Sequence, residues 1–117
     1  MQVSTQQLGD VAVITVDGAV DAGSVNQLRT ELDSLVGSGQ QRFVIDLSKV
    51  PFMDSCGLAT LVQTFKRVRI GSGDVRVAGL QEDVLRIFQL VRLDRVFDLF
   101  PAAPEAVASF GTQHGAG

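Results

Sequence analysis

The sequence predicts a single α/β domain with a mixed, mainly parallel β-sheet, an N-terminal hairpin and about four α-helices. Two β-rich segments open the chain with a Gly-Asp turn between them, which indicates a hairpin. Beyond them, apolar segments with strand character alternate with segments whose apolar residues recur at helical spacing. Such alternation requires crossover connections between parallel strands. The length of 117 residues is typical of one domain.

The first half of the chain is expected to hold the hairpin, a helix and a central strand. A weak strand over 3–8 and a stronger one over 11–16 flank the Gly9-Asp10 turn. A helix is expected over 25–36, because its apolar residues lie three or four positions apart and a Gly-Ser-Gly stop follows them. The run 43–47 is short, apolar and β-rich, which is typical of a strand covered on both faces.

The second half is expected to continue the alternation. Apolar residues after Pro51 mark one face of a second helix: Leu58, Leu61, Val62, Phe65 and Val68. The remaining elements are expected as strand, helix, short strand and proline-initiated helix, over 75–78, 82–90, 96–100 and 104–110. We expect the domain to span residues 1–110 and the tail, 111–117, to be disordered.

Charge and composition exclude several classes of function. The formal net charge is −3, and the chain has no basic stripe that could neutralise a nucleic-acid backbone. Late arginines are interleaved with aspartates, as on a solvated mixed-charge face: Arg86, Arg92 and Arg95 with Asp83, Asp94 and Asp98. The apolar runs are too short to cross a membrane, and the N-terminus lacks the features of a secretory signal. We therefore expect a cytoplasmic protein that binds neither nucleic acid nor a membrane.

Residues suited to catalysis are scarce. The single histidine, His114, has no partner at a spacing that would form a nucleophile–base pair or a metal site. The glycines at positions 71 and 73 do not form a phosphate-binding motif with a lysine. The single cysteine, Cys56, cannot form an internal disulfide, which suits a reducing compartment. We expect no cofactor, no metal and no enzymatic activity.

The most informative stretch runs from the strand at 44–47, through a loop with Pro51, to a helix start at 54–58. Functional sites of open α/β sheets lie at such strand ends. The side chain of Asp54 or Ser55 can cap the helix, because a short side-chain oxygen accepts hydrogen bonds from backbone N–H groups that the helix leaves unpaired. Capping alone is also a sufficient structural reason for both residues.

Three segments carry a resemblance to a known family. They are the stretch from Asp46-Leu47-Ser48 to Asp54-Ser55-Cys56-Gly57-Leu58, the turn Asp17-Gly18-Ala19-Val20-Asp21, and the segment 84–99. They look like the STAS domain, the family of bacterial anti-sigma factor antagonists, and they cover nearly the whole chain in order. The resemblance implies a partner-switching role, in which the unphosphorylated protein binds an anti-sigma factor of the serine/threonine kinase type and frees a sigma factor.

The resemblance also implies a switch by phosphorylation. In the family the kinase modifies a serine or threonine at the start of this helix, usually within Asp-Ser-Ser-Gly or Asp-Ser-Thr-Gly, and a phosphatase would reset it. Here the residue before the glycine is Cys56, so Ser55 is the local phosphate acceptor. The partner-binding residues implied in this way are Asp21, Ser24, Met53, Asp54, Ser55, Cys56, Gly57 and Leu58.

A phosphate on Ser55 would act on partner binding rather than on the helix. It would add about −1.5 to −2 charges at a helix N-terminus, whose partial positive charge favours anions by about 0.3–1 kcal/mol. The helix should therefore survive. Binding would be blocked by the cost of desolvating the phosphate, which Asp54 and, across the strand ends, Asp21 would increase.

Two other functions stay open. A STAS subunit of another signalling or lipid-transport assembly, without phosphorylation, is compatible with the missing second hydroxyl. Alternatively, Cys56 could sense oxidants or link two chains, because helix N-termini favour the thiolate. The nearby Asp54 opposes that reading, and free cysteines are more often packing residues. We expect a monomer or a weak homodimer.

Overall fold

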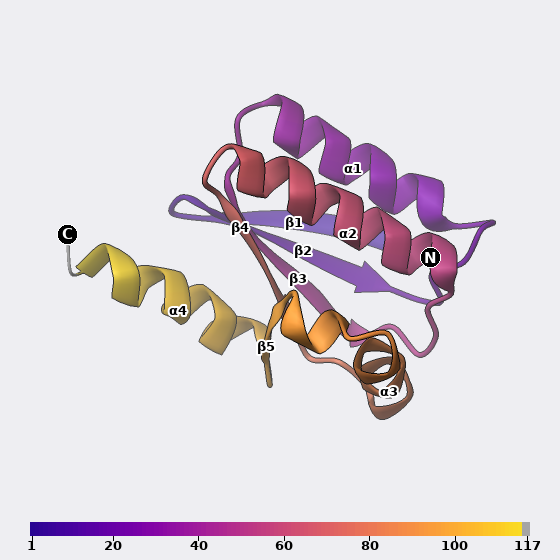
Figure 1. Cartoon of the computed structure of the whole chain (residues 1–117). Helices are drawn as coiled ribbons and strands as arrows, with labels where there is room; N and C mark the ends of the chain where they lie inside the picture. The colour runs from indigo at the N-terminus through magenta and orange to yellow at the C-terminus, as the bar shows by residue number, and fades with distance from the viewer. Residues whose placement is uncertain (116–117) are drawn as a thin grey trace.

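The computed structural model describes the backbone of residues 1–115 and the side chains of residues 1–111. Strands and helices alternate along the chain after an opening pair of strands (Figure 1). In order, the elements are β1 (Gln2–Leu8), β2 (Val11–Asp17), α1 (Val25–Gly37), β3 (Arg42–Lys49), α2 (Ser55–Ile70), β4 (Asp74–Ala78), α3 (Glu82–Leu90), the 3₁₀ turn η1 (Leu93–Arg95), β5 (Asp98–Phe100) and α4 (Ala103–Gly115). No described helix is both long and apolar enough to cross a bilayer.

The five strands form one sheet in the order β1-β2-β3-β4-β5. β1 pairs antiparallel with β2, and the other neighbouring strands pair in parallel. The predicted hairpin and the mixed, mainly parallel sheet are both confirmed. Because β2, β3 and β4 run parallel to one another, with a helical crossover between successive strands, their carboxyl ends lie side by side along the same side of the sheet.

Each face of the sheet has its own hydrophobic core. Ile14, Ile45 and Val77 are register partners on neighbouring strands and belong to the main core, which they share with residues of α1, α2 and α3. On the opposite face, Val13 and Val44 pack with residues of α4. Figure 1 shows α1 and α2 side by side over one face, with α4 set apart from them. The prediction that 43–47 is covered on both faces is thus confirmed for its first residues.

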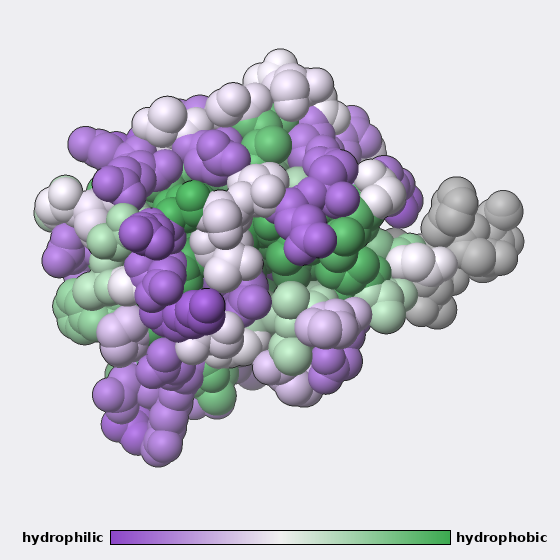
Figure 2. Space-filling model, turned by 180° about the vertical axis from the view of Figure 1, so that it is seen from behind, coloured by the Kyte–Doolittle hydropathy of each residue, from purple (hydrophilic) through white to green (hydrophobic). Residues whose placement is uncertain are grey.

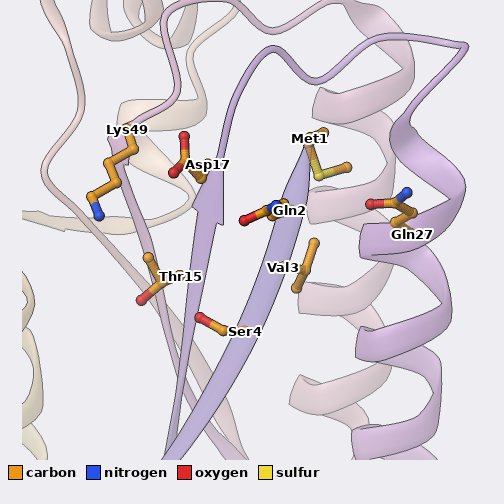
Figure 3. A pocket seen from close by; sticks show the side chains of 8 residues that line it. All are labelled: Met1, Gln2, Val3, Ser4, Thr15, Asp17, Gln27 and Lys49. Carbon is orange, nitrogen blue, oxygen red and sulfur yellow. The ribbon is translucent and has the colours of Figure 1, made fainter.

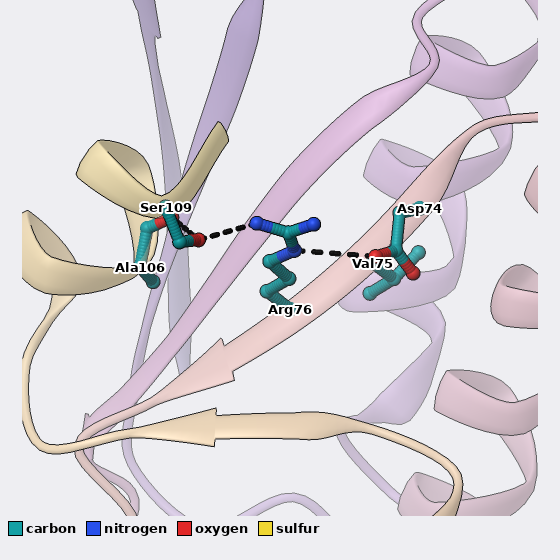
Figure 4. Close-up of polar contacts among 5 residues, drawn as sticks. All are labelled: Asp74, Val75, Arg76, Ala106 and Ser109. Atoms are coloured by element: carbon teal, nitrogen blue, oxygen red, sulfur yellow. Dashed lines mark hydrogen bonds and ion pairs between the residues drawn. The ribbon is translucent and has the colours of Figure 1, made fainter. Parts of the chain in front are cut away.

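A buried arginine fixes α4 to the sheet. Arg76 lies in register with Val44, and only 5% of it is exposed. Its Nε donates to Asp74 Oδ2 at 3.2 Å, and its Nη1 donates to Ser109 Oγ on α4 (Figure 4). The guanidinium lies 3.9 Å from the centre of the Phe110 ring. The charge is tolerated because a carboxylate, a hydroxyl and a ring face replace its water.

The far side of the molecule is only partly covered by α4. Figure 2 shows hydrophobic and hydrophilic surface mixed on this side. A hollow of about 480 Å³ beside α4 is lined in part by Leu8, Val13 and Val107. The part of this face that α4 leaves uncovered lies over β1 and the neighbouring part of β2.

The C-terminal elements differ in detail from the prediction. The strand expected over 96–100 begins only at Asp98, because η1 and Val96 turn the chain first and Phe97 enters the main core. The last helix starts at Ala103 and continues to Gly115, beyond the predicted end at residue 110. A single glycine at position 111 does not stop a helix, because it lowers helix propensity by only about 1 kcal/mol. Residues 116–117 lie outside the described part of the chain.

Candidate functional site

Two loops meet at the carboxyl ends of β2 and β3. The loop after β2 and the loop before α2 are joined by an isolated parallel bridge between Val20 and Met53. Val20 N donates to the Phe52 carbonyl at 2.9 Å, and Asp54 N donates to the Val20 carbonyl at 3.0 Å. The two loops therefore extend the sheet by one step. They form a single surface beside the start of α2.

Asp54 is the N-cap of α2. Its backbone is extended, and its Oδ1 accepts hydrogen bonds from Cys56 N at 2.9 Å and Gly57 N at 3.2 Å. Of the two capping residues that the sequence allowed, Asp54 fills the role. Its second oxygen, Oδ2, accepts from Ala22 N at 3.1 Å. One carboxylate thus holds the helix start and the neighbouring loop together.

Asp21 and Ser24 shape the loop between β2 and α1. Asp21 Oδ1 accepts from the backbone N–H of Gly23 at 3.0 Å and of Ser24 at 3.1 Å. Asp21 N in turn donates to Ser24 Oγ at 3.0 Å, and Ser24 Oγ donates to the Ala19 carbonyl at 2.9 Å. These bonds form a compact turn, and Asp21 and Ser24 both remain partly exposed.

The residues implied for partner binding fall into two groups. Ser55, the first residue of α2, is exposed, and Asp54, Cys56 and Leu58 are half-buried. Met53 and Gly57 are buried. A Cβ atom at Gly57 would lie 2.6 Å from Met53 Cγ and 2.9 Å from Val20 Cγ1, so the close approach of helix and loop requires glycine. Met53 and Gly57 therefore support the surface from beneath.

Two features of this surface were not singled out in the sequence. Phe52 is 49% exposed although it is aromatic, and it immediately precedes the buried Met53. An aromatic residue next to a proline in a loop could have been noticed as a contact candidate. Arg29 of α1 donates to Thr60 Oγ1 at 3.4 Å, and Thr60 Oγ1 donates to the Cys56 carbonyl at 2.9 Å. No spacing in the sequence indicates this link between helices.

The start of α2 presents a small set of chemical groups. Among the described residues, no group of three or more His, Cys, Asp or Glu side chains could hold a metal ion. The side chain of His114 lies outside the described residues. Cys56 packs against the main core, the carboxylate of Asp54 is half-buried, and the exposed groups at the helix start are the hydroxyl of Ser55 and the ring of Phe52.

Comparisons with known proteins agree on one family. The anti-sigma-B factor antagonist of Bacillus subtilis is 33% identical over 86 residues, which cover 74% of this chain and 78% of the relative. The crystal structure of an anti-sigma factor antagonist from Mycobacterium paratuberculosis has a TM-score of 0.85, with 27% identity and 92% of each chain covered.

The fold is shared more widely than the sequence. The phosphorylated form of the Bacillus cell fate determinant SpoIIAA has a TM-score of 0.76 at 17% identity, covering 93% of this chain and 99% of that one. The model of the STAS domain matches residues 2–106. The strand order, the joined loops and this match lead to one conclusion: the chain belongs to the STAS domain family.

Proposed function

We propose that this protein is an anti-sigma factor antagonist that binds an anti-sigma factor and thereby frees a sigma factor. The observation that carries the proposal is the surface made by the two joined loops and the exposed start of α2. Relatives named as anti-sigma factor antagonists cover most of this chain, which supports the assignment. The role is regulatory, without a catalytic step, and it places the protein in the cytoplasm with its sigma factor.

The docking surface is centred on Ser55. Asp54, Ser55, Cys56 and Leu58 provide its helix side, and the turn of Asp21 and Ser24 provides its loop side. We add Phe52 to the contact residues. Half-exposed aromatic side chains next to polar groups contribute much of the binding energy in protein interfaces, since they bury a large area with few rotatable bonds.

The anti-sigma factor is proposed to be a serine/threonine kinase that switches the antagonist off at Ser55. Two backbone N–H groups of the first turn, those of Cys56 and Gly57, already donate to Asp54, so a phosphate on Ser55 would compete with that carboxylate for them. Two negative groups would then lie side by side at the docking surface. Their desolvation on binding opposes the complex while the helix stays folded. A phosphatase would restore binding.

Cys56 does not favour a redox function. Its side chain is half-buried and packs against the main core, as do free cysteines that serve as packing residues. A STAS subunit of an assembly without phosphorylation is the remaining alternative, and phosphorylation of Ser55 by the anti-sigma factor kinase would distinguish the two. SpoIIAA, whose fold this chain shares, has been solved in a phosphorylated form, which supports the proposal that this chain is phosphorylated as well.

In the first test, the protein is incubated with the cognate anti-sigma factor kinase and ATP, and mass spectrometry maps the phosphorylated site. In the second test, calorimetry measures how tightly three variants bind the anti-sigma factor. We expect phosphate on Ser55 alone. Ser55→Ala should bind as the wild type, Ser55→Asp should bind at least 10-fold more weakly (about 1.4 kcal/mol), and Ser34→Asp, which adds the same charge on α1, should bind normally. Tight binding without phosphate would leave a constitutive antagonist, and no binding would refute the proposed partner.

A further inference from the structure

The two edges of the sheet are built differently. At one edge, β5 has only three residues, carries the charged Asp98 and is followed directly by Pro101. A short strand offers few hydrogen bonds, a charge resists burial, and proline has no N–H to donate. This edge therefore has the protection that natural sheets use against pairing with another chain.

The other edge has no such protection. β1 has seven residues, Gln-Val-Ser-Thr-Gln-Gln-Leu, with neither a charge nor a proline, and its register with β2 runs without a bulge. β1 is first in the strand order, so among the described residues no strand pairs with its outer edge. Every side chain of β1 except that of Val3 is exposed. Backbone N–H and C=O groups along this edge are open to another strand.

Hollows flank β1 on both faces. A cavity of about 670 Å³ lies at the first half of the strand. It is lined from α1 by Gln27 and from the neighbouring strands by Thr15, Asp17 and Lys49, whose side chains are drawn in Figure 3. A second hollow of about 410 Å³ lies between β1 and α1 and is lined by Val3, Asn26, Gln27, Thr30 and Glu31. An approaching strand and its side chains thus have room above and below the sheet.

We propose that β1 pairs antiparallel with β1 of a second copy of this chain, around a two-fold axis that passes through Thr5. Two sheets then become one continuous sheet, with both copies of α1 on the same face. In this register Thr5 lies opposite Thr5 of the other copy, and Ser4 lies opposite Gln6. All seven residues of each strand take part, and Leu8 reaches the hollow beside Gln2.

The side chains favour a second copy over a different partner. Serine, threonine and glutamine both donate and accept hydrogen bonds, so Thr5 can pair with Thr5 of the other copy and Ser4 can pair with Gln6. A charged peptide would find no opposite charge on β1.

The dimer is expected to be weak. Two paired strands cover less than the roughly 1,200–2,000 Å² of a stable interface. Thr5 Oγ1 donates to Glu31 Oε2, which brings the Glu31 carboxylates of both copies near the axis, where they repel each other.

The experiment uses opposite charges on β1 of the full chain. One double variant is Ser4→Lys with Gln6→Lys, and the other is Ser4→Glu with Gln6→Glu. In sedimentation velocity we expect wild-type protein to shift from monomer to dimer as concentration rises, each variant alone to stay monomeric, and an equal mixture of the two to regain the dimer. A monomeric wild type up to about 1 mM, dimers of either variant alone, or a monomeric mixture would overturn the proposal.

A crosslink tests the register. In a Cys56→Ser background, Thr5→Cys should form a disulfide between copies on mild oxidation. Opposite residues on the axis have Cβ atoms about 4.5–5.5 Å apart, and a small shift brings them within the roughly 3.5–4.5 Å that a disulfide spans. Gln7→Cys, on the same face, should form none, because Gln7 lies opposite Val3 and far from its own counterpart. Equal crosslinking of both variants would refute the axis at Thr5. The charge variants at Ser4 and Gln6 keep Cys56 and change no residue of the proposed docking surface, so retained binding of the anti-sigma factor by these variants separates failure of this inference from failure of the proposed function.

Discussion

The side-chain carboxylate of Asp54 accepts a hydrogen bond from the backbone N–H of Ala22 in the neighbouring loop, and the same carboxylate caps α2. The oxygen that accepts from Ala22 N, at 3.1 Å, is Oδ2, and the cap uses Oδ1. The two tasks can therefore be separated by substitution, which makes this residue the natural first target.

We expect Asp54→Ala to lower the free energy of unfolding by about 1–2 kcal/mol, because both the cap and the loop bond are lost. Asp54→Asn should lower it less, since the amide oxygen still caps the helix while the amide nitrogen cannot accept from Ala22 N. Urea unfolding measures the stabilities. Hydrogen exchange should accelerate at Ala22 in both variants and at Cys56 only in the alanine variant. Unchanged exchange at Ala22 in Asp54→Asn would contradict the assignment.

Gly57→Ala should lower the free energy of unfolding by about 1–3 kcal/mol, because the new methyl group would overlap Met53 and Val20. The matched control is Gly37→Ala, the last residue of α1, where a Cβ atom meets nothing within 4 Å. There the stability should hold or rise by up to about 1 kcal/mol. Equal effects at the two glycines, by thermal and urea unfolding, would show that the close approach at Gly57 is unimportant.

Arg76→Met should destabilise the fold by about 2–3 kcal/mol, because the substitution leaves Asp74 and Ser109 without the buried guanidinium. Hydrogen exchange in α4 should rise most. The control is Arg42→Met. Arg42 pairs with Asp10 at 3.1 Å, but it is partly exposed, so its loss should change the stability by less than about 1 kcal/mol. Similar losses for the two arginines would argue against Arg76 as the anchor of α4.

Arg92→Gly should raise the stability by about 1 kcal/mol. Arg92 follows Val91, the C-cap of α3, and has φ at 65°, a left-handed conformation in which a Cβ atom is strained. Arg92→Ala keeps the Cβ atom and should leave the stability nearly unchanged. Denaturant midpoints of the three proteins decide this, and a glycine variant no more stable than the alanine variant would refute the strain.

Phe52→Ala should weaken binding of the anti-sigma factor by about 2 kcal/mol or more, a factor of about 30, while the free energy of unfolding changes by less than about 0.5 kcal/mol. Leu90→Ala serves as control, since Leu90 is 75% exposed at the end of α3 and lies outside the proposed surface. Calorimetry with both variants measures the difference. Normal binding by Phe52→Ala would remove Phe52 from the contact residues.

Much of the fold could be predicted because the local patterns and the tertiary structure agree. The apolar spacing in 25–36 and the stop after it gave the helix α1 nearly to the residue, and the Gly9-Asp10 turn gave the hairpin. The run 43–47 was predicted as a strand covered on both faces, and its residues now divide between the two cores. Asp54 was one of two predicted caps because short polar side chains serve that role in many helices.

What could not be predicted depends on contacts between distant segments. Arg76 looks like an exposed strand residue until α4, some thirty positions later, covers it with Ser109 and Phe110. Met53 lies in a loop, yet the bridge to Val20 draws its side chain into the core. The late entry into β5 follows from the burial of Phe97 against Phe65 and Phe88, which no local pattern specifies.

The bridge between Val20 and Met53 has a consequence for the thermodynamics of binding. Because backbone hydrogen bonds already fix both loops, little conformational entropy remains to be lost when a partner docks. Lengthening the segment 18–23 by flexible residues would keep every contact side chain and still reduce affinity, through a less favourable entropy of association. The affinity of this surface for a partner is therefore expected to depend on the rigidity of its loops before binding as well as on its side chains.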